Sequence, residues 1–348
     1  MKTQSKFMAL IIVAVLAGCR DIYVKPADSE MHLADFEATW NRVNAVYPFL
    51  EMKEIDWDAL YGVYKQRTID ARGDEFLQVM CDLLGELKDG HTYLQLNGGD
   101  RIYPWYPDRE QKDRHLYNPF VVRGYFDTEL LVNDSRSAEY GITADNIGYV
   151  FLSDFHEGYY QSEFAGIMSY LQNTRGLVID IRQKRGGSLQ NIQAVVAHFS
   201  ETPIAMPKLI ILDEEIPLEP VQPRSPVYFP KPVMVLVNGS TFSAGEVTTE
   251  ILKQLPYVTV IGDTTGGGGV VSSGDPPDAR AEYKLPSGNK IYIGTGYFEK
   301  YDGEPFEWSG IVPDVIIQNK PEELEQGIDR QLSLAMETIR FLTNNGSE

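Results

Sequence analysis

One serine stands where it could act as a nucleophile. Ser243 follows the strand-like apolar run 233–237 and opens the segment Ser243-Ala244-Gly245-Glu246, which begins a predicted helix. Free N–H groups and the dipole at a helix N-terminus favour an oxyanion, so a hydroxyl at this junction suits attack on a carbonyl. The segment also fits a capping box, with Ser243 as N-cap and Glu246 at N3. Taken alone, it leaves nucleophile and helix cap both open.

A histidine supplies the candidate general base. His91 follows Asp89-Gly90 at the end of a predicted helix, and this Asp-Gly pair predicts a turn. An imidazole can accept a proton from a serine near neutral pH, although a lone turn histidine is more often a surface residue. His156-Glu157 lacks the second histidine of a helical zinc site, which excludes that class of metalloprotease. We expect neither a metal nor a cofactor.

Two glycine-rich loops follow strand-like runs. The run 177–181 leads into Gly186-Gly187, and the run 258–261 leads into the four glycines 266–269. Glycine lets backbone amides approach a ligand closely. The first loop lacks the lysine and hydroxyl pattern of a phosphate loop. For the first loop the alternative is an ordinary strand-to-helix turn, and for the second it is a flexible surface loop.

The chain that positions these residues divides into consecutive segments. Apolar residues at helical spacing predict a bundle of about three helices over 31–90. Residues 91–145 predict a small β-rich segment, with extended runs such as 119–122. Residues 146–348 predict an α/β domain that ends in an amphipathic helix, because short apolar strands alternate with helix-like segments. The expected strands are 147–152, 177–181, 233–237 and 258–261, the expected helices are 162–173, 188–199 and 244–255, and the expected hairpin is 284–293.

The N-terminus has the features of a targeting signal. Lys2 and Lys6 precede the apolar run 7–16, which is too short to span a bilayer. Small residues then lead to Cys19, as in bacterial lipoprotein signals. We therefore expect residues 1–18 to be removed, Cys19 to carry the lipid and residues 19–30 to form a tether, with an ordinary secretory signal as the alternative. The expected location is the bacterial cell envelope, with the protein lipid-anchored to a membrane and facing the periplasm or the exterior.

Composition narrows the function classes. The 348 residues carry a formal charge of −19, and 43% are hydrophobic. This is ordinary globular usage, which excludes global disorder. The acidity argues against nucleic acid as a partner, because phosphate binding needs clustered Lys and Arg. The sequence does not indicate an oligomeric state.

The order of the motifs resembles a known family. Asp-Gly-His-Thr at 89–92, Asp-x-Arg with its Gly-Gly loop at 180–187, Ser-Ala-Gly-Glu at 243–246, Ile-Gly-Asp-x-Thr-Gly at 261–266 and Gly-Ile-x-Pro-Asp at 310–314 follow one another. This series resembles the tail-specific serine peptidases, which include the C-terminal-processing peptidases and the tricorn core. The resemblance implies a crotonase-like (ClpP-like) α/β catalytic domain that hydrolyses peptide bonds. It implies Ser243 as nucleophile, and an oxyanion hole formed by the amides of Ala244 and of Gly186 or Gly187.

The two branches of that family activate the serine differently. The processing branch uses a lysine within Gly-Lys-Gly, and Gly268 stands at the equivalent position here. The tricorn-like branch uses a histidine and a glutamate, which match His91 and Glu307. Gly90 replaces the serine before that histidine and Lys184 replaces an asparagine of the Asp-x-Arg loop. The resemblance therefore leaves open whether Glu307 reaches His91 directly or through a hydroxyl.

The expected function is a membrane-anchored serine endopeptidase that acts on peptides or unfolded proteins outside the cytoplasm. Only about 55 residues separate His91 from the first α/β strand, which is too few for a PDZ module and its connections, so recognition of free C-termini is not implied. A catalytically weak or inactive member that binds an apolar ligand or a peptide is the alternative. An esterase with the same serine and histidine is a third possibility.

Overall fold

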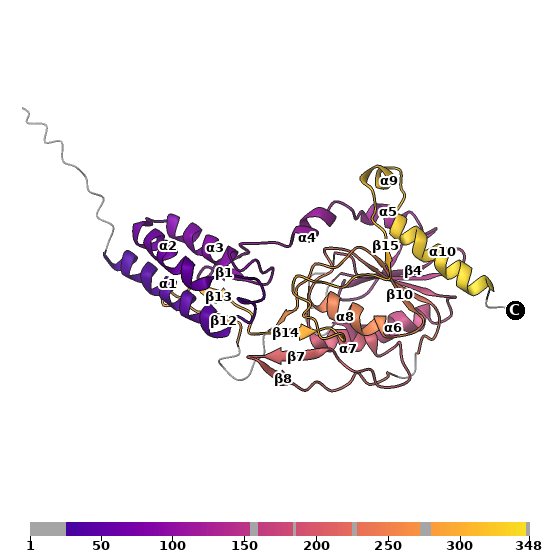
Figure 1. Cartoon of the computed structure of the whole chain (residues 1–348). Coiled ribbons are helices and arrows are strands. Elements are labelled where there is room, and N and C mark those ends of the chain that lie inside the picture. Colours follow the sequence, from indigo (N-terminus) through magenta and orange to yellow (C-terminus); the bar gives the residue numbers. More distant parts are fainter. Residues whose placement is uncertain (1–25, 154–158, 184–185, 225–227, 272–279, 346–348) are drawn as a thin grey trace, which may run out of the picture.

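A computed structural model describes residues 26–153, 159–183, 186–224, 228–271 and 280–345. The chain begins with three helices: α1 (Pro26–Val46), α2 (Trp57–Asp70) and α3 (Glu75–Gly85). Asp56 caps α2, because its carboxylate accepts a hydrogen bond from the Ala59 amide at 3.0 Å. In Figure 1 these helices form the indigo bundle at one end of the molecule. They confirm the helical N-terminal part of the predicted fold.

The next segment mixes strands and short helices. One prediction here is wrong, because residues 119–122 form helix α5 (Pro119–Arg123) and not an extended run. The Asn118 side chain accepts a hydrogen bond from the Phe120 amide at 3.0 Å, and Pro119 occupies the first helical turn, where its missing N–H is harmless. The remaining elements are β1 (Tyr93–Gln95), β2 (Arg101–Ile102), α4 (Asp108–Asp113), β3 (Leu131–Val132) and β4 (Ala138–Ile142).

A seven-stranded mixed sheet organises the α/β body. Its order is β15-β10-β9-β6-β5-β4-β3. The strands from β15 to β5 are mutually parallel, and β4 and β3 add antiparallel pairs. This confirms the predicted α/β class with mainly parallel strands. The new strands are β5 (Gly148–Leu152), β6 (Leu177–Asp180), β9 (Val233–Val237), β10 (Val258–Gly262) and β15 (Val315–Ile316).

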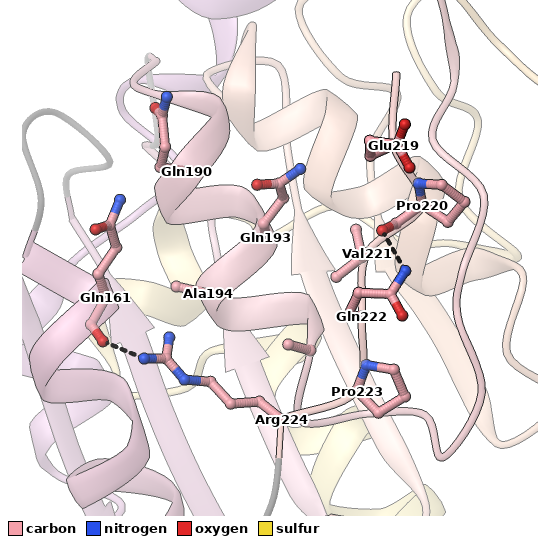
Figure 2. Close-up of a pocket in the computed structure, with 11 residues that line it drawn as sticks. Gln161, Gln190, Gln193, Ala194, Glu219, Pro220, Val221, Gln222, Pro223 and Arg224 are labelled. Atoms are coloured by element: carbon pink, nitrogen blue, oxygen red, sulfur yellow. Dashed lines mark hydrogen bonds between the residues drawn. The ribbon is translucent and has the colours of Figure 1, made fainter. Parts of the chain in front are cut away.

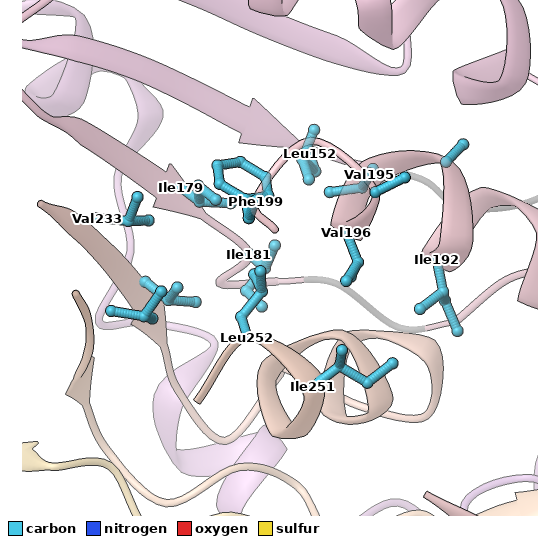
Figure 3. Packing of buried hydrophobic residues seen from close by; sticks show 14 of the residues in the cluster. Leu152, Ile179, Ile181, Ile192, Val195, Val196, Phe199, Val233, Ile251 and Leu252 are labelled. Carbon is cyan, nitrogen blue, oxygen red and sulfur yellow. The ribbon is translucent and has the colours of Figure 1, made fainter. Parts of the chain in front are cut away.

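Helices cover both faces of this sheet. Helices α6 (Tyr159–Leu171), α7 (Leu189–Val196) and α8 (Ala244–Lys253) bury one face, where Ile179 and Ile251 belong to the same apolar cluster (Figure 3). The last helix, α10 (Arg330–Asn345), follows α9 (Pro321–Glu325) and packs on the other face. Both faces of each central strand are therefore apolar, which explains the unbroken hydrophobic runs in the sequence.

Two smaller four-stranded sheets complete the described fold. One has the order β12-β13-β1-β2, with β12 (Glu282–Lys284) and β13 (Lys290–Tyr292) forming the predicted hairpin. The other has the order β11-β14-β7-β8 and contains β7 (Lys208–Ile211), β8 (Glu214–Ile216), β11 (Val270–Val271) and β14 (Gly296–Glu299). Because Leu285, Ile291 and Ile293 are buried in the core of the N-terminal helices, the chain returns to the bundle late in the sequence.

The expected signal and lipid site, residues 1–18 and Cys19, lie outside the described residues. Within the described ranges, none of the helices combines the length and the apolar character that a membrane crossing requires.

Candidate active site

One cavity of about 700 Å³ brings most of the candidate residues together. Ser243, His91, Ala244, Gly186 and Gly187 all line it, although they come from distant parts of the sequence. Ser243 and Ala244 stand at the start of α8, and the glycines lead into α7. The motif order therefore predicted a real spatial cluster.

Ser243 has a strained backbone that ordinary helix capping does not need. Its φ of +53° and ψ of −116° lie outside the extended region that N-cap residues favour. A Cβ on Gly186 would lie 3.9 Å from the Ser243 Oγ, so the glycine loop passes directly beside the hydroxyl. As the first residue of α8, Ala244 has an amide without an intrahelical acceptor. This arrangement suits a nucleophile beside an oxyanion hole better than a helix cap alone.

Glu246 organises the loop around Ser243. Its buried carboxylate accepts hydrogen bonds from the Ser243 amide at 3.0 Å and from the Gly267 and Gly268 amides at 2.8 Å each. The Thr265 hydroxyl donates a fourth at 2.6 Å. Burial raises the pKa of Glu246, and these donors oppose the increase. The four-glycine stretch is therefore a structured support of Ser243 and not a loose surface loop.

The Phe242 ring explains why glycine stands at positions 90 and 268, where the family patterns have larger residues. A Cβ on Gly268 would lie 1.9 Å from the Phe242 ring, and a Cβ on Gly90 would lie 2.9 Å from it. The same ring stacks on the His91 imidazole with a centroid distance of 4.6 Å. A lysine at 268 would collide with this ring, so the structure has no room at that position for the lysine of the processing branch.

His91 lines the same cavity as Ser243 without bonding to it. No hydrogen-bond partner for either ring nitrogen is found among the described residues. Contacts of this kind are often long in unliganded enzymes and shorten when substrate binds. The nearest carboxylate is that of Asp89, whose Oδ1 lies 3.7 Å from the His91 Nδ1.

Glu307 is not among the residues that line the cavity. It is buried, and its Oε1 lies 2.5 Å from the Lys53 Nζ. Burial is the main cause that raises the pKa of Glu307 to about 8; repulsion from Asp89 adds to it, and Lys53 opposes it. The structure therefore places Glu307 on a lysine that the sequence did not single out.

Sequence reasoning missed three residues that shape the site: Lys53, Asp89 and Phe242. Asp89 was visible in its motif, but the pattern did not distinguish a turn aspartate from a partner of His91. Lys53 lies among other charged residues and has no motif at all. Lys184, the substituted position of the glycine loop, lies outside the described residues.

A second cavity, of about 520 Å³, lies beside α7 and is lined by four glutamines and by Arg224 (Figure 2). The Arg224 side chain donates a hydrogen bond to the Gln161 carbonyl at 2.8 Å. None of the candidate residues lines this cavity, and Gln190 is shared with the first one. We assign the chemistry to the first cavity.

Two family profiles match the chain. Residues 146–317 match peptidase family S41, and residues 29–85 match the tricorn protease C1 domain. The first contains Ser243 and Glu307, and the second contains Lys53.

Individual relatives agree with these profiles. The carboxy-terminal processing protease CtpB of Bacillus subtilis is 28% identical over 167 residues, which are 45% of this chain and 34% of that protein. The tricorn protease homolog of Saccharolobus solfataricus is 24% identical over 265 residues, which are 73% of this chain and 22% of that protein. The matches thus span about a third or less of these relatives. The crystal structure of a putative peptidase from Parabacteroides merdae has a TM-score of 0.75 and 25% identity, with 89% of this chain and 96% of that chain covered.

Proposed function

Because this chain belongs to peptidase family S41, we propose that it is a serine peptidase in which Ser243 is the nucleophile and His91 the general base. The observation that carries this proposal is the strained Ser243, which shares one cavity with His91 and lies beside the Gly186 backbone. A protein that only binds an apolar ligand has no need for this strain. The geometry therefore favours hydrolysis over the binding alternative.

The reaction follows from the positions of these groups. The Ser243 Oγ attacks the carbonyl carbon of the peptide bond while His91 accepts its proton. The amides of Ala244 and of Gly186 or Gly187 stabilise the negative oxygen of the tetrahedral intermediate. His91 then donates the proton to the departing amine, and water hydrolyses the acyl-enzyme. Glu307 contributes from the buried side, through its ion pair with Lys53.

The cavity suits an extended peptide or an unfolded protein segment. Strand β11 is the edge of its sheet, and both of its residues line the cavity, so a substrate strand can add to this edge. Apolar side chains next to Ser243 would receive an apolar substrate residue; they are Ile192, Leu209, Val247 and Phe298. Since a relative is named a carboxy-terminal processing protease, cleavage near substrate C-termini is the specific activity to examine.

The test compares Ser243→Ala with Ser240→Ala, a matched change of a buried serine three residues earlier. We expect a fluorophosphonate probe to label the wild type and Ser240→Ala but not Ser243→Ala, and peptide hydrolysis to fall at least about 10⁴-fold in Ser243→Ala. Label on Ser243→Ala would exclude Ser243 as the nucleophile. Peptides with free and amidated C-termini, together with an ester of the same acyl group, separate a processing peptidase from a general peptidase and from an esterase.

The proposed location is the bacterial cell envelope, with the protein attached to a membrane through lipid on Cys19. The support is the sequence of residues 1–19. Metabolic labelling with a palmitate analogue should mark the wild type and not Cys19→Ser. Equal labelling of both proteins would reject the anchor.

A further inference from the structure

Asp89 is a buried carboxylate directed at the candidate base. It is 1% exposed, and its Oδ1 accepts a hydrogen bond from the His91 backbone amide at 2.7 Å. The same oxygen lies 3.7 Å from the His91 Nδ1, and Oδ2 has no hydrogen-bond partner among the described residues. A small rotation of the imidazole would therefore form an Nδ1–H···O bond without moving the backbone.

Lys53 joins this region to Glu307. Its Nζ bonds to the Glu307 Oε1 at 2.5 Å and to the carbonyl oxygens of Leu87 and Lys88 at 3.0 Å each. Those carbonyls belong to the turn that carries Asp89 and His91. The ammonium group is fully buried and thus fixes the end of this turn against the Glu307 segment.

We propose that Asp89 is the carboxylate that orients His91 and offsets the charge of its imidazolium, and that Glu307 acts on the base only through Lys53. The proposal rests on the function proposed above. It makes Asp89, Lys53 and Glu307 positioning residues of one unit. In this unit His91 contacts the turn that carries Asp89, Lys53 bonds to the carbonyls of that turn, and Glu307 bonds to Lys53.

The charges of this unit support the assignment. Above about pH 8, where Glu307 as well as Asp89 is ionised, Asp89, Glu307 and Lys53 carry a net charge of −1 next to a neutral imidazole. When His91 takes the serine proton, the unit becomes neutral, so proton transfer removes a buried charge imbalance and does not create one.

The surroundings of His91 leave Asp89 as its nearest carboxylate. Phe242 covers one face of the ring, and a buried carboxylate in contact with a histidine fixes both its tautomer and its direction. Burial would raise the pKa of Asp89, but the backbone hydrogen bond from His91, the nearby imidazole and the charge of Lys53 outweigh it and lower the pKa to about 2. The other titratable groups that face this unit are Tyr47 and Glu246.

The first experiment measures peptide hydrolysis by Asp89→Asn in the full chain. We expect kcat to fall by about 10²–10⁴-fold with KM changed by less than about threefold, because the amide keeps the backbone contact but loses the charge. The acidic limb of the pH–rate profile should move to lower pH by about one unit, since the imidazolium loses its partner. Fluorophosphonate labelling of Ser243 should slow in parallel.

The second experiment removes the ion pair and keeps Asp89. The double variant Lys53→Met with Glu307→Gln should lose less kcat than either single change, because each single change leaves a buried charge without its partner. If Glu307 contacted His91 itself, the double variant would lose as much as Glu307→Gln alone.

Asp35→Asn is the matched control, because Asp35 is also 1% exposed and accepts a backbone amide, that of Ser287 at 2.9 Å. It should lower the melting temperature without moving the pH–rate profile. If Asp89→Asn stays within threefold of the wild-type kcat while Glu307→Gln loses more than 100-fold, the proposal is overturned. If Ser243→Ala remains active, the function itself fails, so the two failures are distinguishable. If Asp89→Asn does not fold, the Lys53→Met, Glu307→Gln double variant still tests whether Glu307 acts on His91 only through Lys53.

Discussion

Phe242 shows how one side chain can determine which neighbours a site tolerates. Its ring fills the space beside His91, and two backbone positions that face it, Gly90 and Gly268, have no room for a Cβ. Sequence comparison presented Gly90 and Gly268 as separate departures from family patterns. In the structure they share one cause, which no sequence pattern reveals because the three residues meet only after folding.

Gly268→Ala tests this packing. The added methyl group would lie 1.9 Å from the Phe242 ring, so we expect about 1–3 kcal/mol of destabilisation and at least a tenfold loss of kcat as the ring displaces His91. Adding Phe242→Leu to Gly268→Ala should restore part of the lost stability and part of the lost kcat. Gly166→Ala, where nothing lies within 4 Å, is the control and should be neutral or slightly stabilising in chemical denaturation. Wild-type kcat in Gly268→Ala would contradict the role of the ring.

The pKa of Glu307, which burial raises to about 8, predicts a pH effect. Above this pH the carboxylate is charged, which adds negative charge behind His91 and favours its imidazolium. Activity should therefore continue to rise as the pH passes through about 8 and should fall as Glu307 is protonated below it. A pH–rate profile of the Lys53→Met, Glu307→Gln double variant should lack this upper step; its persistence there would assign the step to another group.

At the scale of elements, α8 does more than present Ser243. Glu246, one turn into the helix, holds the Ser243 amide and the glycine loop with the same carboxylate. The sequence predicted the capping box from Ser243 and Glu246, and the Glu246 half of it exists. It could not predict the other donors, because residues 265–268 reach Glu246 only through the tertiary fold.

Glu246→Gln replaces an acceptor-only group by an amide whose N–H₂ faces other donors. We expect a loss of about 2–4 kcal/mol in stability and of more than 100-fold in kcat. The control is Glu250→Gln in the same helix, whose carboxylate accepts only the Tyr301 amide at 2.9 Å among the bonds described. This variant should lose stability and keep its kcat. Stability is measured by thermal denaturation and kcat by peptide hydrolysis. Equal losses of kcat in Glu246→Gln and Glu250→Gln would show that Glu246 has no special role.

The same scale shows what local pattern could predict. Apolar runs predicted the central strands and helices correctly, because both faces of the sheet are buried. The extended prediction for 119–122 failed because a cap and a first-turn proline outweigh the strand propensity of Val121 and Val122. Strands β7, β8, β11 and β14 have four residues or fewer, which is too short for periodicity to identify them.

At the scale of the whole molecule, the β12–β13 hairpin joins the later part of the chain to the N-terminal helices. It pairs with β1, two residues after His91, and places Ile291 in the core of the N-terminal helices. Sequence segments suggested consecutive units, but this pairing links residues about 200 positions apart.

Ile291→Ala should weaken that link. We expect about 2–5 kcal/mol of destabilisation from the cavity and a fall in kcat below the melting temperature, because the turn that carries His91 loses its support. Ile167→Ala, a comparably buried change in the α/β core, should lower stability with less effect on kcat. Calorimetry together with activity at 25 °C would distinguish them, and equal kcat losses would argue against the hairpin as a support.

The hairpin also affects the moment at which activity can arise during synthesis. The ribosome releases His91 and the bundle first, then Ser243, and only afterwards residues 282–292, which hold the two parts together. A nascent chain therefore contains His91 and Ser243 before it contains the element that aligns them. On the function proposed above, a chain built in this order gains its activity only when it is nearly complete, which protects its own unfolded segments from cleavage.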